Sequence, residues 1–257
     1  MVEHTRQHLR LAQTAPPGQR ATLALGTLFL PATLKRRATA PLFIHFHGAA
    51  WLAETAATEL KQTAVISVQL GPGSAAYAKP FAMPQAFAAL LAEAETKAGM
   101  KFAPITLTAW SAGYGAVREI LSVPENYARV DRVVLLDGLH AGYASGQPGP
   151  LESQLETDKL MIFLAFARDA AAGRKRLFIT HTEIFPGTFA STTETTNWLL
   201  RELKLKRRPV LKWGPLGTQQ TSEVKQGGFH LAGFAGNSAP DHVDHLHALS
   251  EWLKQWK

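Results

Sequence analysis

The 257-residue sequence contains no cysteine. Disulfide bonds, thiolate zinc sites and catalytic cysteines are therefore excluded. No hydrophobic run approaches the roughly 20 residues of a membrane-spanning helix, so we expect no stable membrane insertion. Residues 1–13 are polar and lack the apolar centre of a signal peptide. We therefore expect either a cytoplasmic protein or a secreted protein whose leader has been removed.

Charged residues are also sparse, at 18% of the chain, whereas hydrophobic residues make up 46%. This balance is typical of a globular protein and unlike that of a disordered chain. The 27 basic residues outnumber the 20 acidic ones, which gives a net charge of +7. These basic residues form short clusters beside expected strands, without interleaved aromatic residues. They therefore indicate solubilising loop charge and no nucleic-acid partner.

Strands and helices alternate along most of the sequence. We expect an N-terminal arm over residues 1–20 and a single domain over residues 21–257. Strands are expected at 22–30, 42–47, 64–70, 105–110, 132–136, 176–182, 210–213 and 228–234. Helices are expected at 52–61, 85–97, 113–122, 151–171, 193–205 and 241–256, with a surface loop at 141–150. This alternation predicts an α/β fold with one open, mostly parallel sheet and helices on both faces.

The most informative stretch is residues 105–115. Its apolar and β-branched run predicts a buried strand that ends at Ser111, and a helix follows from Gly113. A strand, a tight turn with serine at its tip and a helix form a nucleophile elbow, which raises the hydroxyl above the sheet. The usual signature is Gly-x-Ser-x-Gly, and Ala109 here replaces the first glycine. Small neighbours suit a serine held in a strained backbone conformation.

Other reactive side chains follow other strands, and the carboxyl ends of strands are where the sites of open α/β sheets lie. The residues at these ends are His47, Gly48, Ser111, Asp137, His140, Glu183 and the group Asp241, His242 and His245. A serine, an acid and a histidine together can carry out nucleophilic acyl transfer. The chain order serine, acid, histidine is the one that α/β-hydrolases use.

The sequence resembles α/β-hydrolases of the esterase/lipase type over roughly residues 21–257. The resemblance is carried by the motifs His47-Gly48-Ala49-Ala50 and Ala109-Trp110-Ser111-Ala112-Gly113 and by the late His242. The departures from the family pattern are Ala109 and the pair Ala49-Ala50, where esterases often have glycines. The resemblance implies the α/β-hydrolase fold and a serine hydrolase that needs no cofactor, and we expect a small-molecule ester as its substrate.

Ser111 is the expected nucleophile, and the backbone N–H of Ala112 with that of Ala49 or Ala50 is expected to bind the oxyanion. In similar hydrolases the catalytic histidine lies just before the last helix, which favours His242, with His245 as the alternative. Asp137 is the expected acid, and Glu183 and Glu194 are the alternatives. Glu194 also matches a capping box, which marks the start of a helix.

Aromatic residues are the expected substrate contacts. The foremost are Trp51, Trp110 and Tyr114, and the wider set adds Tyr77, Phe81, Tyr143, Phe185 and Phe189. His45 and His47 lie on one side of a strand and could chelate a metal with residues 241–245. The hydrolase interpretation already explains these positions, so we expect no metal. The competing interpretations are an amidase, lactonase or acyltransferase with the same triad, and a non-catalytic binding protein of the same fold.

Overall fold

The computed structural model describes residues 6–148 and 154–255. Its strands are β1 (Gly18–Leu23), β2 (Gly26–Pro31), β3 (Thr39–Phe46), β4 (Ala64–Val68), β5 (Lys101–Trp110), β6 (Val130–Leu136), β7 (Arg176–His181), β8 (Arg208–Trp213), β9 (Gln219–Gln226) and β10 (Phe229–Phe234). Its α-helices are α1 (Ala50–Leu60), α2 (Ser74–Phe81), α3 (Ala86–Ala98), α4 (Tyr114–Leu121), α5 (Pro124–Arg129), α6 (Met161–Ala171), α7 (Thr192–Leu203), α8 (Ala239–His247) and α9 (Leu249–Lys254). Short 3₁₀ turns are η1 (Ser111–Gly113), η2 (Thr157–Leu160) and η3 (Pro215–Gly217).

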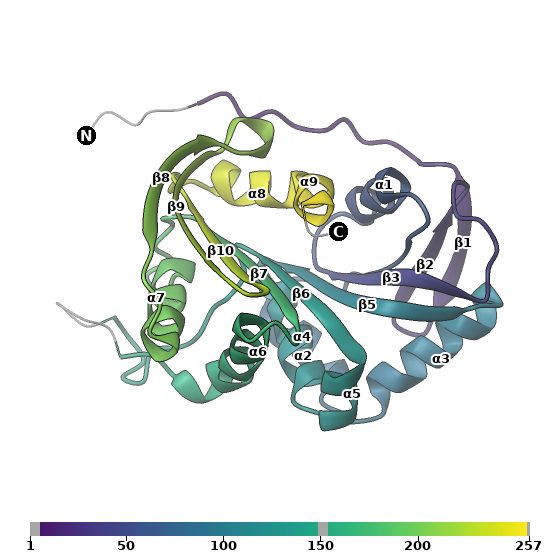
Figure 1. The fold of residues 1–257 in the computed structure, drawn as a ribbon, viewed down its shortest axis with the longest axis horizontal. Coiled ribbons are helices and arrows are strands. Elements are labelled where there is room, and N and C mark those ends of the chain that lie inside the picture. The colour runs from purple at the N-terminus through teal and green to yellow at the C-terminus, as the bar shows by residue number, and fades with distance from the viewer. Residues whose placement is uncertain (1–5, 149–153, 256–257) are drawn as a thin grey trace.

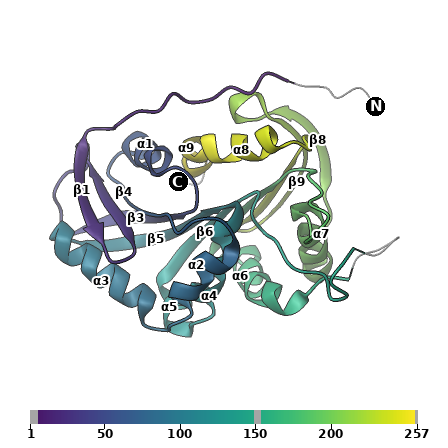
Figure 2. The same ribbon diagram turned by 180° about the vertical axis from the view of Figure 1, so that it is seen from behind.

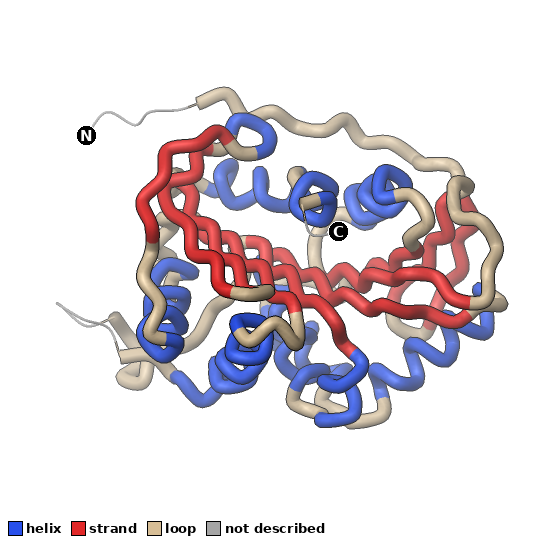
Figure 3. Tube along the Cα trace, in the orientation of Figure 1, coloured by secondary structure: helices blue, strands red, loops and turns tan. Residues whose placement is uncertain are grey.

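All ten of these strands form one sheet, in the order β1-β2-β4-β3-β5-β6-β7-β10-β9-β8. The central strands from β4 to β10 pair in parallel, whereas β1, β2, β9 and β8 pair antiparallel at the two edges. Helices α1, α8 and α9 cover one face, and α2 to α7 cover the other (Figures 1 and 2). The continuous sheet is clearest in Figure 3. The expected mostly parallel sheet with helices on both faces is confirmed.

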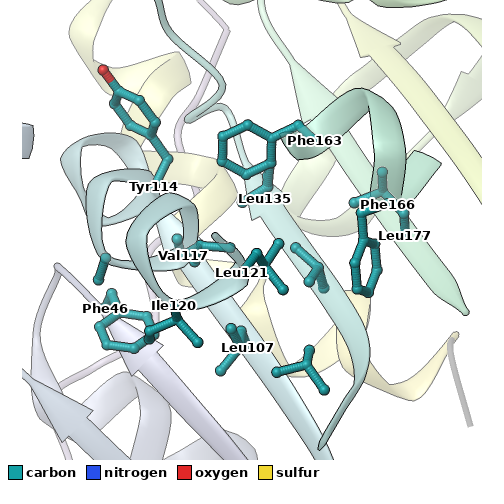
Figure 4. Packing of buried hydrophobic residues seen from close by; sticks show 14 of the residues in the cluster. Phe46, Leu107, Tyr114, Val117, Ile120, Leu121, Leu135, Phe163, Phe166 and Leu177 are labelled. Carbon is teal, nitrogen blue, oxygen red and sulfur yellow. The ribbon is translucent and has the colours of Figure 1, made fainter. Parts of the chain in front are cut away.

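Apolar residues on both faces of the central strands explain this layered arrangement. Neighbouring residues of a strand point to opposite faces, so Val133 and Val134 of β6 belong to different hydrophobic cores. On one face Leu107 and Leu135 pack with the apolar side of α4, as Figure 4 shows. On the other face Trp252 of α9 packs against the sheet. Burial on both sides is typical of parallel strands. Because these strands are parallel, their carboxyl ends lie at the same edge of the sheet.

Several elements differ from the sequence-based expectation. The single strand expected at 22–30 is a hairpin of β1 and β2, because the chain turns at Gly26 with φ of +100°. A Cβ at Gly26 would lie 2.3 Å from the backbone oxygen of Ser67 on the neighbouring β4, so only glycine fits there. Helices α2 and α5 and strand β9 were not expected. Strand β9 is an exception to the usual signal because its sequence, QQTSEVKQ, is mostly polar.

The last expected helix is divided into α8 and α9 at Ala248. The helix expected at 151–171 begins as η2 and continues as α6, and its first residues, 151–153, lie outside the described part of the chain. Residues 149 and 150 of the expected loop and residue 256 of the last expected helix also lie outside it. Within the described ranges, no helix is both long and apolar enough to cross a membrane.

Buried histidines make the stability of this fold sensitive to acid. Burial lowers the pKa of His45 to about 3 and the pKa values of His181 and His245 to about 4. A histidine of the unfolded chain titrates near pH 6.5. Below that pH the unfolded state binds protons that the folded state refuses. The stability that these residues contribute is therefore complete above about pH 6.5 and is lost as the pH falls toward 4.

We expect the free energy of unfolding to fall between pH 7 and pH 5, by up to about 1.4 kcal/mol per histidine and pH unit. Urea titrations at several pH values measure this slope. The variant His45→Leu removes one of the buried imidazoles. The slope of its unfolding free energy against pH should therefore be smaller by the contribution of one proton, up to about 1.4 kcal/mol per pH unit. A stability that stays constant from pH 7 to pH 5 would contradict this account.

Candidate active site

The chain turns sharply at Ser111, between β5 and α4. Ser111 has φ of +47°, in the left-handed region that residues other than glycine rarely adopt. It begins η1, which leads directly into α4. A strained residue at the end of a buried strand is a common sign of a functional position. The hydroxyl thus lies at the carboxyl end of the sheet, where the sequence motif predicted it.

Two glycines allow the backbone to pack tightly around this turn. A Cβ at Gly113 would lie 2.2 Å from the backbone oxygen of Phe46 at the end of β3. A Cβ at Gly138 would lie 2.8 Å from both the nitrogen and the oxygen of Ser111. Larger residues at either position would push the turn away from its neighbours. Gly113 of the motif and Gly138 after β6 are therefore each required for a steric reason.

Asp137 follows β6 directly and is buried, with 2% of its surface exposed. Its carboxylate accepts hydrogen bonds from the backbone N–H of Thr182 (2.8 Å), the Thr182 hydroxyl (2.8 Å) and the Thr192 hydroxyl (2.7 Å). Burial acts to raise the pKa of Asp137. Hydrogen bonds from His242 and Thr192 and the nearby imidazole of His245 outweigh it and hold the pKa well below its usual range. The carboxylate is therefore ionised at neutral pH.

The fourth hydrogen bond to Asp137 comes from His242 in α8. His242 Nδ1 lies 2.7 Å from Asp137 Oδ2. An ionised carboxylate can only accept, so Nδ1 carries the proton and Nε2 is left as the basic nitrogen. The side chain of His242 is 22% exposed, which leaves it accessible to a small molecule.

Trp110 connects His242 to the turn at Ser111. The indole Nε1 donates a hydrogen bond of 3.0 Å to the backbone oxygen of His242. The indole and imidazole rings are also in contact, with 4.6 Å between their centroids. Because Trp110 directly precedes Ser111 in the chain, these contacts hold α8 beside the elbow.

His245, the alternative histidine, and the neighbouring His247 have other partners. His245 is buried, and its Nδ1 lies 2.7 Å from the hydroxyl of Thr180. His247 accepts a hydrogen bond of 3.2 Å from the backbone N–H of Leu11. Of the late histidines, His242 is the one that contacts both Asp137 and Trp110.

The two alternative acids occupy different environments. Glu183 follows β7 but is exposed. Glu194 lies in the first turn of α7, where it accepts hydrogen bonds from the backbone N–H of Ser191 (2.8 Å) and the hydroxyl of Tyr143 (3.1 Å). It forms the capping box that the sequence indicated, and this explains Glu194 by the start of a helix.

The loop after β3 faces the elbow from the other side. His47 and Gly48 have φ of 69° and 107°, and α1 begins at Ala50 with Ala49 as its N-cap. The first N–H groups of a helix have no carbonyl partner within that helix, which leaves them free to bind an oxyanion. The His47 ring stacks on Trp110, with 5.0 Å between centroids. The loop is therefore tied to the same indole that contacts His242.

Aromatic residues from the sequence analysis separate into two groups. Tyr77, Phe81 and Tyr143 are core residues, whereas Phe185 and Phe189 are exposed. Trp51 lies against His247, with ring centroids 5.8 Å apart. Tyr114 lines a cavity of about 450 Å³ between α2, α4 and the loop after β6, together with Ser74, Arg118, Ala141 and Glu156. This cavity opens next to the helix that follows Ser111.

Sequence reasoning missed two sets of residues at this site. The first is the pair Thr182 and Thr192, whose hydroxyls hold Asp137. The signal available was a threonine at the end of β7 and another at the start of α7. The second set is Arg6, His8 and Arg10, which contact Asp244 in α8. Their alternation in the N-terminal arm was visible, but nothing local identified the partner.

One cluster of described residues has the donor atoms of a metal site: His8, Asp241 and Asp244. The guanidinium groups of Arg6 and Arg10 already lie on these carboxylates. A further cation would be repelled by them. His45 and His47, the other histidines considered for a metal, have the hydroxyls of Thr108 and Tyr77 as partners at 2.8 Å.

The sheet order, the turn at Ser111 and the surrounding loops define the α/β-hydrolase fold that the motifs predicted. No protein-family model and no curated protein matches the chain. Similar solved structures include several esterases, at low identity and high coverage.

An esterase from Pyrobaculum calidifontis aligns with a TM-score of 0.53 and 12% identity over 94% of this chain and 85% of that one. A thermophilic esterase from Thermogutta terrifontis, with propionate bound, aligns with a TM-score of 0.52 and 14% identity over 93% of this chain and 94% of that one. A cold-adapted esterase from an Arctic intertidal metagenomic library has a TM-score of 0.50 and 14% identity over 93% of this chain and 91% of that one. At these identities the likeness establishes the fold.

Proposed function

We propose that the protein is a serine esterase that cleaves small carboxylic esters through an acyl-enzyme intermediate. The observation that carries the proposal is the hydrogen bond between His242 and Asp137, formed beside the strained turn at Ser111. A serine, an imidazole and an ionised carboxylate are the three groups that acyl transfer requires. The α/β-hydrolase fold supports this reaction class because its esterases present the same three groups at strand ends.

In the proposed reaction Ser111 Oγ attacks the ester carbonyl and transfers its proton to His242 Nε2. The tetrahedral oxyanion accepts hydrogen bonds from the N–H groups of Ala112 and of Ala49 or Ala50. The imidazolium then protonates the leaving alcohol, and the acyl group remains on Ser111. Water, deprotonated by His242, releases the acid and restores the serine hydroxyl. Asp137 remains ionised throughout and stabilises the imidazolium.

Labelling with a fluorophosphonate tests the nucleophile without assuming a substrate. The activated serine should displace fluoride, so we expect one phosphonyl group per chain, located by mass spectrometry on the peptide that contains Ser111. Ser122, 11 residues farther along at the end of α4, is exposed, and its hydroxyl donates to the backbone oxygen of Arg118; it serves as the internal control. An adduct at another residue, or a folded protein that does not react at all, would overturn the proposal.

The substrate class is tested with matched acyl compounds. The esterase of similar fold from Thermogutta terrifontis holds propionate, so p-nitrophenyl propionate is a suitable first ester. We expect turnover of this ester to exceed that of propionyl p-nitroanilide, in which an amide replaces the ester. Faster cleavage of the anilide would assign the site to amide hydrolysis.

A further inference from the structure

From residue 6 on, the N-terminal arm crosses the face of the protein on which α8 and α9 lie (Figures 1 and 2). Residues 6–17 of the arm belong to no strand or helix. Three basic side chains, those of Arg6, His8 and Arg10, alternate along it. Alternate residues of an extended chain point to the same side. All three meet a single carboxylate, that of Asp244 in α8.

Asp244 is fully buried, and its side chain has no exposed surface. Its carboxylate receives the guanidinium groups of Arg6 and Arg10 and the Nδ1 of His8, which lies 2.8 Å away. Burial and the charge of Arg6 lower the pKa of His8, so the positive charge at Asp244 comes from the two arginines. A buried carboxylate is strongly destabilising unless such partners are present.

Further contacts join the arm to both ends of α8. Arg6 reaches Asp241 at 3.2 Å, and Arg10 donates to the backbone oxygen of Pro240 at 2.9 Å. The N–H of Leu11 donates to His247 Nδ1 at 3.2 Å. These contacts lie on either side of His242 along the helix. The arm therefore contacts both ends of the short helix that carries the proposed catalytic histidine.

We propose that residues 6–11, here named the strap, position His242 by holding α8 against the elbow. This inference rests on the function proposed above. Arg6 and Arg10 are its positioning residues: they act through Asp244 and touch neither the ester nor the reacting atoms. Releasing the strap frees α8 to shift relative to Asp137, which follows β6, and Trp110, the last residue of β5. Misplacement of a catalytic group by about 1 Å is enough to lower a rate by about 100-fold.

The kinetic test compares the double variant Arg6→Ala/Arg10→Ala with the control Arg20→Ala. Arg20 also joins the N-terminal region to a helix, through a bidentate ion pair with Glu54 of α1 at 2.6 and 3.0 Å. This ion pair does not involve α8. We expect kcat of the double variant to fall by about 10- to 100-fold with KM changed less than about twofold. The control should keep its parental kcat, and Arg6→Lys/Arg10→Lys should recover part of the loss.

A second readout does not depend on catalysis. In protein labelled with 5-fluorotryptophan, the ¹⁹F resonance of Trp110, assigned with Trp110→Phe, reports its contact with His242. Loss of the strap should shift or broaden this resonance and leave that of Trp198 in α7 unchanged. If neither the parent nor any variant hydrolyses the ester but the Trp110 resonance changes in the double variant, the proposed function is wrong and the structural role of the strap is supported.

The variant Asp244→Asn covers the case in which the double variant does not fold. It removes the buried charge together with the attraction for the arginines, so no unpaired carboxylate remains. We expect the same fall in kcat and the same change at Trp110. A folded variant of either kind, verified by circular dichroism, that keeps both the parental kcat and the parental Trp110 resonance would overturn the strap.

Discussion

Replacing Ser111 with alanine should lower kcat for p-nitrophenyl propionate by about 10⁶-fold, the loss that removal of a serine nucleophile causes in serine proteases. Without the hydroxyl no acyl-enzyme can form, and only the oxyanion donors and substrate binding remain. The stability should change little, because the larger part of the strain at φ of +47° lies in the backbone and alanine keeps it. Steady-state kinetics and a thermal melt measure the two effects.

The variant Ser122→Ala is the matched control for this experiment. It removes the same hydroxyl from an exposed position at the end of α4, where the side chain bonds the backbone oxygen of Arg118. Its kcat should equal that of the parent. Parental turnover by Ser111→Ala would show that the hydrolysis does not use this serine.

The variant Asp137→Asn should lower kcat by about 10⁴-fold, as the same change does in a serine protease triad. The N–H of Thr182 and the hydroxyl of Thr192 both donate to Oδ1, so this position must remain an oxygen. The new amide nitrogen then takes the place of Oδ2 and donates to His242 Nδ1. The imidazole proton moves to Nε2, which can no longer accept the proton of Ser111.

The variants Glu183→Gln and Glu194→Gln make the same chemical change at the two alternative acids. Glu183→Gln should retain the parental kcat, because its side chain is exposed at the end of β7. Glu194→Gln should reduce stability by about 1 kcal/mol through the weakened helix cap, while kcat changes little. A 10⁴-fold loss at Glu183 with parental kcat in Asp137→Asn would reassign the acid.

Local sequence patterns were sufficient for the elbow and the general fold. Ser111 could be selected because its strand, turn and helix are consecutive in the chain, so a short window contains the whole pattern. The fully apolar strands likewise indicated a sheet buried on both faces, and its mostly parallel order is confirmed. Element ends were less accurate because capping and turn geometry decide them.

Asp137 was the expected acid, but no local pattern separated it from the alternatives Glu183 and Glu194. Asp137 and Glu183 follow β6 and β7, which are neighbours in the sheet, so both end at the same edge. The difference arises from the φ of +44° at Asp137 and from hydroxyls of Thr182 and Thr192, which are 45 and 55 residues farther along the chain. No local pattern encodes such a pocket.

The strap and strand β9 were missed for related reasons. Arg6 and Asp244 are 238 positions apart, and an alternation of three basic residues is more often a solvated surface. Only two side chains of strand β9, Glu223 and Val224, are buried, so its sequence is mostly polar. It is a strand because it pairs with β10. In both cases the partner, and not the segment itself, determines the structure.

The antiparallel strands at both margins of the sheet have a practical consequence for changing substrate preference. They pair with β4 and β10, the outermost of the parallel strands, so β3, β5, β6 and β7 lie inside the sheet with a parallel neighbour on each side. The loops that follow β3, β6 and β7 are anchored to these inner strands. Libraries that randomise those loops, with the strands and the residues Gly48, Asp137, Gly138 and Thr182 kept, should therefore retain folded proteins while they sample new shapes of the site.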